Sequence, residues 1–159
     1  MQLPISQVDV FAGRTQGGNP VAVVHDADDL SDGQMAAFAR WTNLSETTFL
    51  LRPTHPEADY RLRIFTPGGE LPFAGHPTLG SCHAWLEAGG VVHSSDAVMQ
   101  ECAVGLVPVR RGTGRLAFAA PPLIRSGPLD EDLLARLLDV LDLPREAVVD
   151  HQWVDNGPG

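Results

Sequence analysis

Residues 76–87 are small or apolar on nearly every side, and this segment limits most strongly what the chain can fold into. Its ends carry helix signals, with Pro77 expected at the first helical position and Gly89-Gly90 just beyond the last one. A helix without a wide polar face needs cover on several sides. The segment therefore predicts a central helix enclosed by a barrel-like sheet, with Leu79, Ala84 and Leu86 in the core.

Short strands are expected before and after this helix. Residues 60–65 alternate between polar and apolar side chains and should pair with the extended segment 47–51. Gly112-Thr113-Gly114 has the turn chemistry to join two strands as a hairpin, whereas 66–73 is expected to be a turn-rich connection. The expected strands are 5–11, 20–24, 47–51, 60–65, 98–102, 105–110 and 115–119. Together with the helices, they indicate an α+β fold.

A second helix is expected to begin at Ser31. Gln34 follows three residues later, which is a capping-box pattern, and Met35, Phe38 and Ala39 supply an apolar face. Asn43 is suited to close the helix in a left-handed conformation. The sequence thus marks the start, the buried face and the end of this helix.

The sequence changes character after Pro121-Pro122, which ends the run of expected strands. Residues 130–141 should form a helix that stops before Pro144. Its leucines share one stripe: Leu133, Leu134, Leu137, Leu138 and Leu141. We therefore expect a first domain over 1–122 and the start of a second, incomplete domain over 123–159. The last residues, 154–159, resemble the segment 17–20, so we expect the chain to be cut from a longer one.

Charge and residue content argue against several kinds of partner and site. The net charge is −9 and the 11 Lys and Arg residues are scattered, so no nucleic-acid partner is expected. No apolar run approaches the ~18 residues of a membrane span and no leader is visible, which predicts a cytoplasmic protein without membrane contact. His76 and His83 would lie about 10 Å apart along a helix, too far to chelate one ion, so no metal is expected.

Two features of the sequence could carry acid/base chemistry. Glu46 lies where a helix ends and a strand begins, and a glutamate becomes a useful base when burial raises its pKa. Gly75 and His76 lie at the start of the central helix, where free backbone N–H groups attract a carboxylate and an imidazole can relay a proton. Two plainer interpretations stay open: a solvated glutamate on a strand edge, and a tight turn with an exposed histidine.

A cysteine-based mechanism is not favoured. Cys82 is expected inside the central helix and Cys102 within a strand, so neither lies at a helix N-terminus, where a thiolate would be stabilised. Two cysteines are also too few for a disulfide framework.

Five segments together resemble the phenazine-biosynthesis, PhzF-like, isomerase family. They are Val8-Asp9-Val10-Phe11, residues 17–24 around Gly18-Asn19-Pro20, residues 42–49 around Leu44-Ser45-Glu46, Arg63-Ile64-Phe65-Thr66-Pro67, and residues 70–80 around Gly75-His76-Pro77. Asp155-Asn156-Gly157-Pro158 is similar to the family's entry into its second domain.

The resemblance implies a diaminopimelate-epimerase-like fold: two similar domains, each a mixed sheet curled around a central helix, with the active site between them. It implies that no cofactor takes part, that Glu46 moves a proton on a small carboxylate substrate such as trans-2,3-dihydro-3-hydroxyanthranilate, and that His76 assists. The ligand would also be lined by Ser45, Gly75, Pro77 and Thr78.

Three functions follow as hypotheses. The leading one is half of a proton-shuttling isomerase, completed as a homodimer or by a chain that carries the second half. The alternatives are a non-catalytic module that binds small anions at the helix start, and an epimerase of amino acids or hydroxy acids. The isomerase and the epimerase both require Glu46 to face His76.

Overall fold

The computed structural model describes residues 2–94, 96–119 and 122–155. It divides into two compact units, residues 1–120 and 121–159, which we describe one at a time. The expected turn at 156–159 and the first proline of the pair at 121–122 lie outside the described residues. No helix in the described part of the chain is both long enough and apolar enough to cross a membrane.

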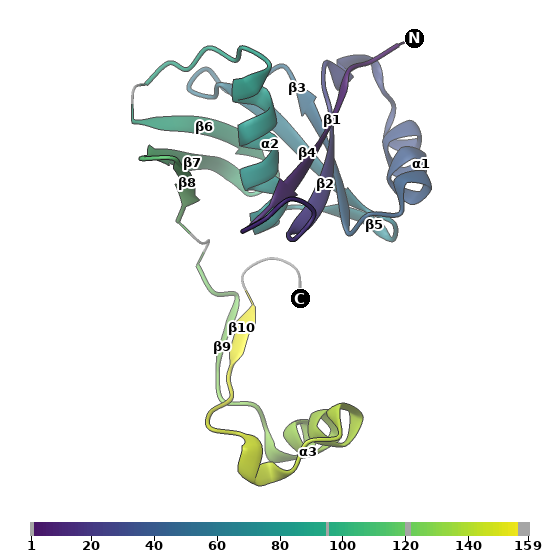
Figure 1. The fold of residues 1–159 in the computed structure, drawn as a ribbon, viewed down its shortest axis with the longest axis vertical. Helices are drawn as coiled ribbons and strands as arrows, with labels where there is room; N and C mark the ends of the chain where they lie inside the picture. Colours follow the sequence, from purple (N-terminus) through teal and green to yellow (C-terminus); the bar gives the residue numbers. More distant parts are fainter. Residues whose placement is uncertain (1, 95, 120–121, 156–159) are drawn as a thin grey trace. The chain divides into compact units, whose positions relative to one another are not determined.

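The first unit is built on one mixed sheet (Figure 1). Its strands run in the order β1-β2-β3-β4-β6-β7-β8, and β5 pairs with β4. Two neighbouring pairs, β2 with β3 and β4 with β6, are parallel, and the others are antiparallel. The bounds are β1 Ile5–Val10, β2 Asn19–Val24, β3 Glu46–Leu51, β4 Tyr60–Thr66, β5 Gly69–Leu71, β6 Ala97–Cys102, β7 Gly105–Gly112 and β8 Arg115–Phe118.

The strand pairings that the sequence predicted are present. β3 and β4 are antiparallel neighbours, with Thr48 opposite Ile64, and β7 and β8 form the expected hairpin, with Gly112 opposite Arg115. The expectation for 66–73 was incomplete, because β5 lies within that connection. A strand of three residues is too short for alternation to reveal it.

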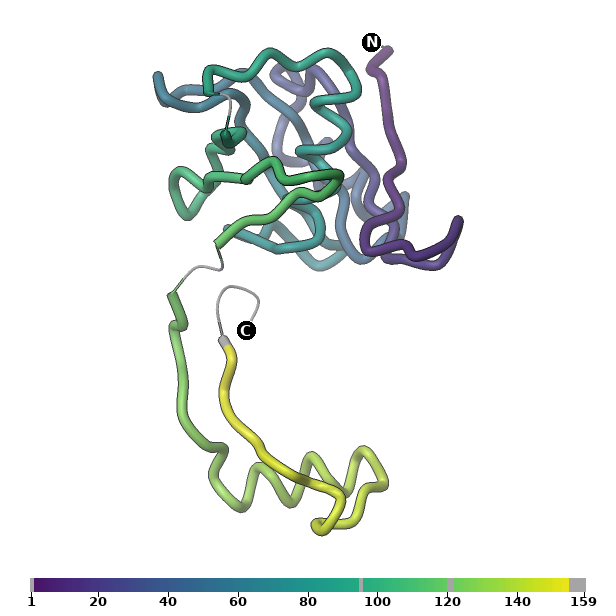
Figure 2. The backbone as a smooth tube through the Cα atoms, turned by 60° about the vertical axis from the view of Figure 1, so that its left-hand side comes forward, coloured from purple at the N-terminus to yellow at the C-terminus, as the bar shows by residue number. Residues whose placement is uncertain are grey.

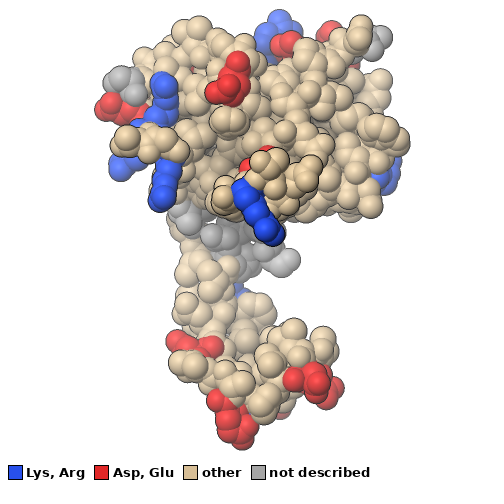
Figure 3. Space-filling model, in the orientation of Figure 1, with Lys and Arg blue, Asp and Glu red and all other residues tan. Residues whose placement is uncertain are grey.

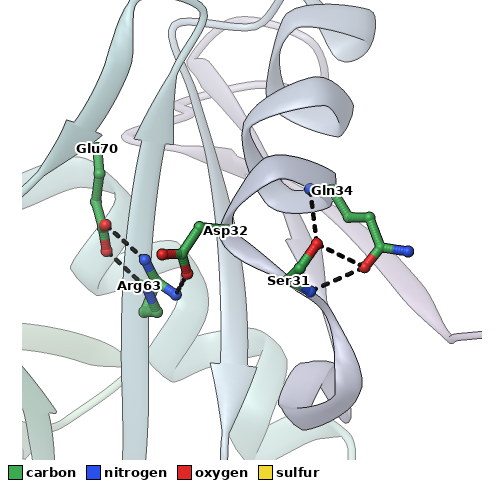
Figure 4. Close-up of polar contacts among 5 residues, drawn as sticks. All are labelled: Ser31, Asp32, Gln34, Arg63 and Glu70. Atoms are coloured by element: carbon green, nitrogen blue, oxygen red, sulfur yellow. Dashed lines mark hydrogen bonds and ion pairs between the residues drawn. The ribbon is translucent and has the colours of Figure 1, made fainter.

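Helix α1, Asp32–Thr42, follows the short 3₁₀ helix Ala27–Asp29 and packs against the sheet. The predicted capping box is present at Ser31 and Gln34, and Asn43 adopts the left-handed conformation with φ 53°. Arg63 of β4 binds Glu70 of β5 and Asp32 of α1, so one guanidinium joins two strands to the helix (Figure 4). Its hydrogen bond and charge lower the pKa of the Asp32 carboxyl group.

Helix α2, Gly75–Glu87, lies within the curl of the sheet (Figures 1 and 2). The helix begins at Gly75, one residue before the predicted segment, so Pro77 is its third residue and not its first. Proline tolerates this place because the first turn has free N–H groups. The expected core positions were partly right. Ala84 is buried, but Leu79 and Leu86 are half-buried at the edge of the core.

The interior of the curl is partly polar and holds hydrogen bonds between side chains. The Tyr60 hydroxyl donates to Gln100 Oε1 at 3.0 Å, and Gln100 Nε2 donates to Thr78 Oγ1 at 3.2 Å. Thr48 and Ser81 share a hydrogen bond of 2.8 Å between their hydroxyl groups. These hydrogen bonds connect α2 to β3 and β6, and because they are directional they fix the orientation of the helix more specifically than apolar packing alone.

The second unit holds a two-stranded ribbon and helix α3. β9 Arg125–Gly127 pairs antiparallel with β10 Trp153–Asp155, α3 spans Glu131–Leu141, and a 3₁₀ helix covers Arg145–Ala147. Within the leucine stripe, Leu134 and Leu138 are buried, whereas Leu137 and Leu141 are exposed. Acidic side chains are prominent on the face of this unit seen in Figure 3. That these residues begin a second epimerase-like domain stays a prediction.

Candidate active site

Glu46 is the first residue of β3, and its backbone lies beside Val21 of β2 in a parallel pair. The left-handed turn at Asn43 redirects the chain from α1 into this strand. The Glu46 side chain is 16% exposed, which is low for a carboxylate. The interpretation of Glu46 as a fully solvated residue on a strand edge therefore does not fit the structure.

His76 is the second residue of α2, and its side chain is 9% exposed. Its Nδ1 atom lies 3.4 Å from Glu46 Oε2. The structure thus brings together the two side chains that the sequence singled out, through the start of a strand and the start of a helix. The interpretation of His76 as an exposed turn residue is wrong.

Two buried polar atoms of this pair have no hydrogen-bond partner in the described part of the chain. They are Glu46 Oε2 and His76 Nε2. A buried polar group without a partner costs about 1–3 kcal/mol, so such groups are uncommon and often mark a site that a ligand completes. One carboxylate and one imidazole could accept and deliver protons on such a ligand.

The start of α2 offers backbone donors beside this pair. The first backbone hydrogen bond of the helix runs from the Thr78 N–H group to Ala74 O, at 3.3 Å. The N–H groups of Gly75 and His76 lie before it and have no carbonyl acceptor within the helix. The absence of a side chain at Gly75 admits the Phe118 ring, because a Cβ atom there would lie 2.9 Å from Phe118 Cζ. Sequence reasoning did not anticipate Phe118, which lies in β8 and carries no local signal.

The other predicted site residues fall into two groups. Ser45 is exposed beside Glu46 and donates from Oγ to Asn19 Oδ1 at 3.1 Å. Pro77 and Thr78 are buried, and the Thr78 hydroxyl group accepts from Gln100. A ligand contact for these two residues stays a prediction.

The cysteines are thiols inside the fold. Burial raises the pKa of the Cys82 thiol to about 11 and also raises that of Cys102. Near neutral pH neither is the thiolate that a cysteine base requires. Among the described residues, no three His, Cys, Asp or Glu side chains gather as a metal ion would need.

Two cavities lie elsewhere in the first unit, and neither is lined by Glu46 or His76. One, of about 640 Å³, lies near the C-terminal end of α2 and is lined by residues such as His25, Tyr60 and Trp85. The other, of about 670 Å³, lies along the loop between β1 and β2. The Glu46–His76 pair thus lies outside the two described cavities.

Comparison with known proteins places this arrangement in context. The family model described as phenazine biosynthesis-like protein, PhzC-PhzF, matches residues 8–135. Over 101 residues the chain is 50% identical to trans-2,3-dihydro-3-hydroxyanthranilate isomerase of Pseudomonas aeruginosa, covering 64% of this chain and 34% of that protein. Over 101 residues it is 57% identical to Antisense-enhancing sequence 1 of Schizosaccharomyces pombe, with the same shares.

A solved structure described as a predicted epimerase of Pseudomonas aeruginosa has a TM-score of 0.76 and 30% identity, over 93% of this chain and 53% of its own. The diaminopimelate-epimerase-like fold that the resemblance implied, a mixed sheet curled around a central helix, is therefore confirmed, whereas its second domain stays a prediction. The chain spans about a third of the two relatives and about half of the solved structure.

Proposed function

This chain belongs to the PhzC-PhzF family of phenazine biosynthesis-like proteins, and we propose that it supplies the glutamate half of a cofactor-independent isomerase site. The observation that carries the proposal is the buried pair of Glu46 and His76, whose facing atoms lie 3.4 Å apart. Glu46 Oε2 and His76 Nε2 are buried and make no hydrogen bond within the described residues, and a substrate is expected to supply one to each.

In the proposed step, the Glu46 carboxylate takes a proton from one carbon of the substrate and returns it to another. The electron pair left by the C–H bond shifts along the substrate, so the product is an isomer and no oxidant or reductant is needed. His76 donates a hydrogen bond to the oxygen on which negative charge develops. The N–H groups at the start of α2 bind the substrate's carboxylate, because a helix N-terminus favours negative charge.

The substrate is proposed to be a small carboxylate, similar to trans-2,3-dihydro-3-hydroxyanthranilate, the compound named for the Pseudomonas aeruginosa relative. A second candidate is epimerisation of an amino acid or hydroxy acid, because a solved structure that aligns with 93% of this chain is described as a predicted epimerase. Either reaction needs a facing wall for the site. We propose that a second copy of the chain, or a chain with the second half of the fold, provides it.

The test is proton exchange into trans-2,3-dihydro-3-hydroxyanthranilate in D₂O, followed by NMR, with the chain alone and with a chain that supplies the second half. Glu46→Gln keeps the shape of the side chain and removes its basicity, so turnover should fall by at least about 10²-fold while binding changes little. Glu87→Gln, at the exposed far end of α2, is the matched control and should keep full turnover.

A Glu46→Gln variant with undiminished exchange would remove Glu46 from the mechanism. Tight binding of the substrate without exchange, in both the chain alone and the completed complex, would instead favour a module that only binds small anions.

A further inference from the structure

We propose that Asp9 and Asn19 are positioning residues that fix the start of β3 and thereby hold Glu46 within reach of His76. The proposal rests on the function proposed above, because it assigns these two residues to the same site. It also gives a role to the segments around Asp9 and Asn19, which neither transfer a proton nor bind the substrate in that function.

The first step is the turn between β1 and β2. The Asp9 carboxylate accepts hydrogen bonds from the Gly17 N–H group at 3.1 Å and from the Gly18 N–H group at 3.0 Å. Gly18 passes so close to β1 that a Cβ atom there would lie 2.2 Å from Val10 O. Both carboxylate oxygens and a position that admits only glycine therefore fix the path of the chain into Asn19.

The second step leads from Asn19 to the strand that carries Glu46. Asn19 is paired with Val10 of β1, and its Oδ1 atom accepts from Ser45 Oγ at 3.1 Å. Ser45 directly precedes Glu46. A side-chain hydrogen bond thus connects the turn to the residue next to the proposed base.

This bond lies where the backbone ladder stops. The parallel pairing of β2 with β3 begins at Val21 and Glu46, and the preceding residue of β2 is Pro20, which has no N–H group to donate. A strand end without further ladder bonds is free to move. The Asn19–Ser45 bond restrains the backbone at that end, and the Glu46 side chain begins there.

The test uses NMR of the labelled chain, with the imidazole resonances of His76 as the readout of the Glu46 carboxylate beside it. Glu46→Gln should shift these resonances in the otherwise unchanged chain. In the Asn19→Ala background the same substitution should produce about a third of that shift or less, because the two groups are no longer held together. Ser45→Ala removes the other end of the bond and should have the same effect.

Asp9→Ala should also weaken the response of the His76 resonances to Glu46→Gln, and it should speed solvent exchange of the Gly17 and Gly18 amide protons. Thr15→Ala is the matched control, because Thr15 is exposed in the same loop and its hydroxyl group makes no hydrogen bond within the described residues. It should leave the His76 response unchanged. The resonances of core residues show whether each variant is folded. A general loss of stability can therefore be distinguished from a specific loss of the His76 response.

The outcomes separate the two proposals. A full His76 response to Glu46→Gln in folded Asn19→Ala and Ser45→Ala variants would overturn the positioning role while leaving the Glu46–His76 pair in place. No response in the unchanged chain would mean that the pair itself is absent in solution, and it would overturn the positioning role together with the proposed function.

Discussion

The thiol of Cys82 shows how far the interior of the first unit shifts the pKa of a single ionisable group. Burial raises its pKa from 9.0 to about 11, so the native state holds the thiol proton more tightly than the unfolded chain does. This contribution to stability is complete below pH 9 and is lost as the pH rises toward about 11.

Cys82→Ala should therefore flatten the alkaline decline of stability. We expect the difference in unfolding free energy between the unchanged chain and the variant to shrink by about 2 kcal/mol across this window. Urea unfolding at several pH values measures it. Tyr60, whose pKa is raised by burial and also by its contact with Cys82, is present in both proteins, so the comparison reports the thiol together with its effect on Tyr60. Parallel pH profiles for the two proteins would contradict the expectation.

Gly75 and Phe118 form a second pair that can be tested at the level of single residues. A methyl group at Gly75 would lie 2.9 Å from Phe118 Cζ, and the Phe118 ring in turn packs on Phe73 at 5.4 Å between ring centroids. Gly75→Ala should cost about 1–3 kcal/mol by overpacking, and less in a Phe118→Leu background. A double-mutant cycle of unfolding free energies measures this coupling. Additive effects would show that the ring does not restrict position 75.

Among the elements, α2 depends on close approach to the β1–β2 pair. A Cβ atom at Gly80 would lie 2.5 Å from Val21 Cγ1 and 2.9 Å from Val10 Cγ2. Alanine ordinarily stabilises a helix relative to glycine, but Gly80→Ala should destabilise this protein by about 1–3 kcal/mol. Gly33→Ala in α1 is the control: a Cβ atom there meets nothing within 4 Å, and the variant should be neutral or more stable. Thermal unfolding of both variants measures these changes in stability.

Elements with local signals could be predicted from the sequence, and those set by distant contacts could not. The capping box at Ser31 and the turn at Gly112 are written in adjacent residues, and both are confirmed. The parallel pairing of Val21 with Glu46 joins distant segments and has no local signature. β9 and β10 were missed because each has only three residues.

The same limit applies to the site. Acid/base chemistry at Glu46 and His76 could be suggested from their residue types, but their approach to 3.4 Å depends on how the strand and helix starts meet. The hydrogen bonds of Thr78 inside the core were equally invisible, because Gln100 lies on a strand that no spacing rule connects to α2. The chemistry of single residues could therefore be predicted from the sequence, whereas their three-dimensional contacts could not.

At the scale of the whole molecule, exposed apolar side chains in the second unit predict association. On and just beyond α3, Leu137 is 40% exposed, Leu141 61% and Leu143 47%. Fully burying a side chain of this kind contributes about 1.5–3 kcal/mol. Leu134 and Leu138 of the same stripe are already buried. Helix α3 therefore has one buried edge and one exposed edge, the open edge, which a partner can cover.

We expect the purified chain to form a dimer at micromolar concentration, measured by light scattering or sedimentation, because association would cover this open edge. The double variant Leu137→Glu, Leu141→Glu should be monomeric, since two carboxylates oppose burial of the edge. Val149→Glu is the matched control: Val149 is 99% exposed in the same unit but lies outside the helix, so the variant should still dimerise. A monomeric unchanged chain, or a double variant that associates as strongly, would show that α3 is not the surface that brings the chains together.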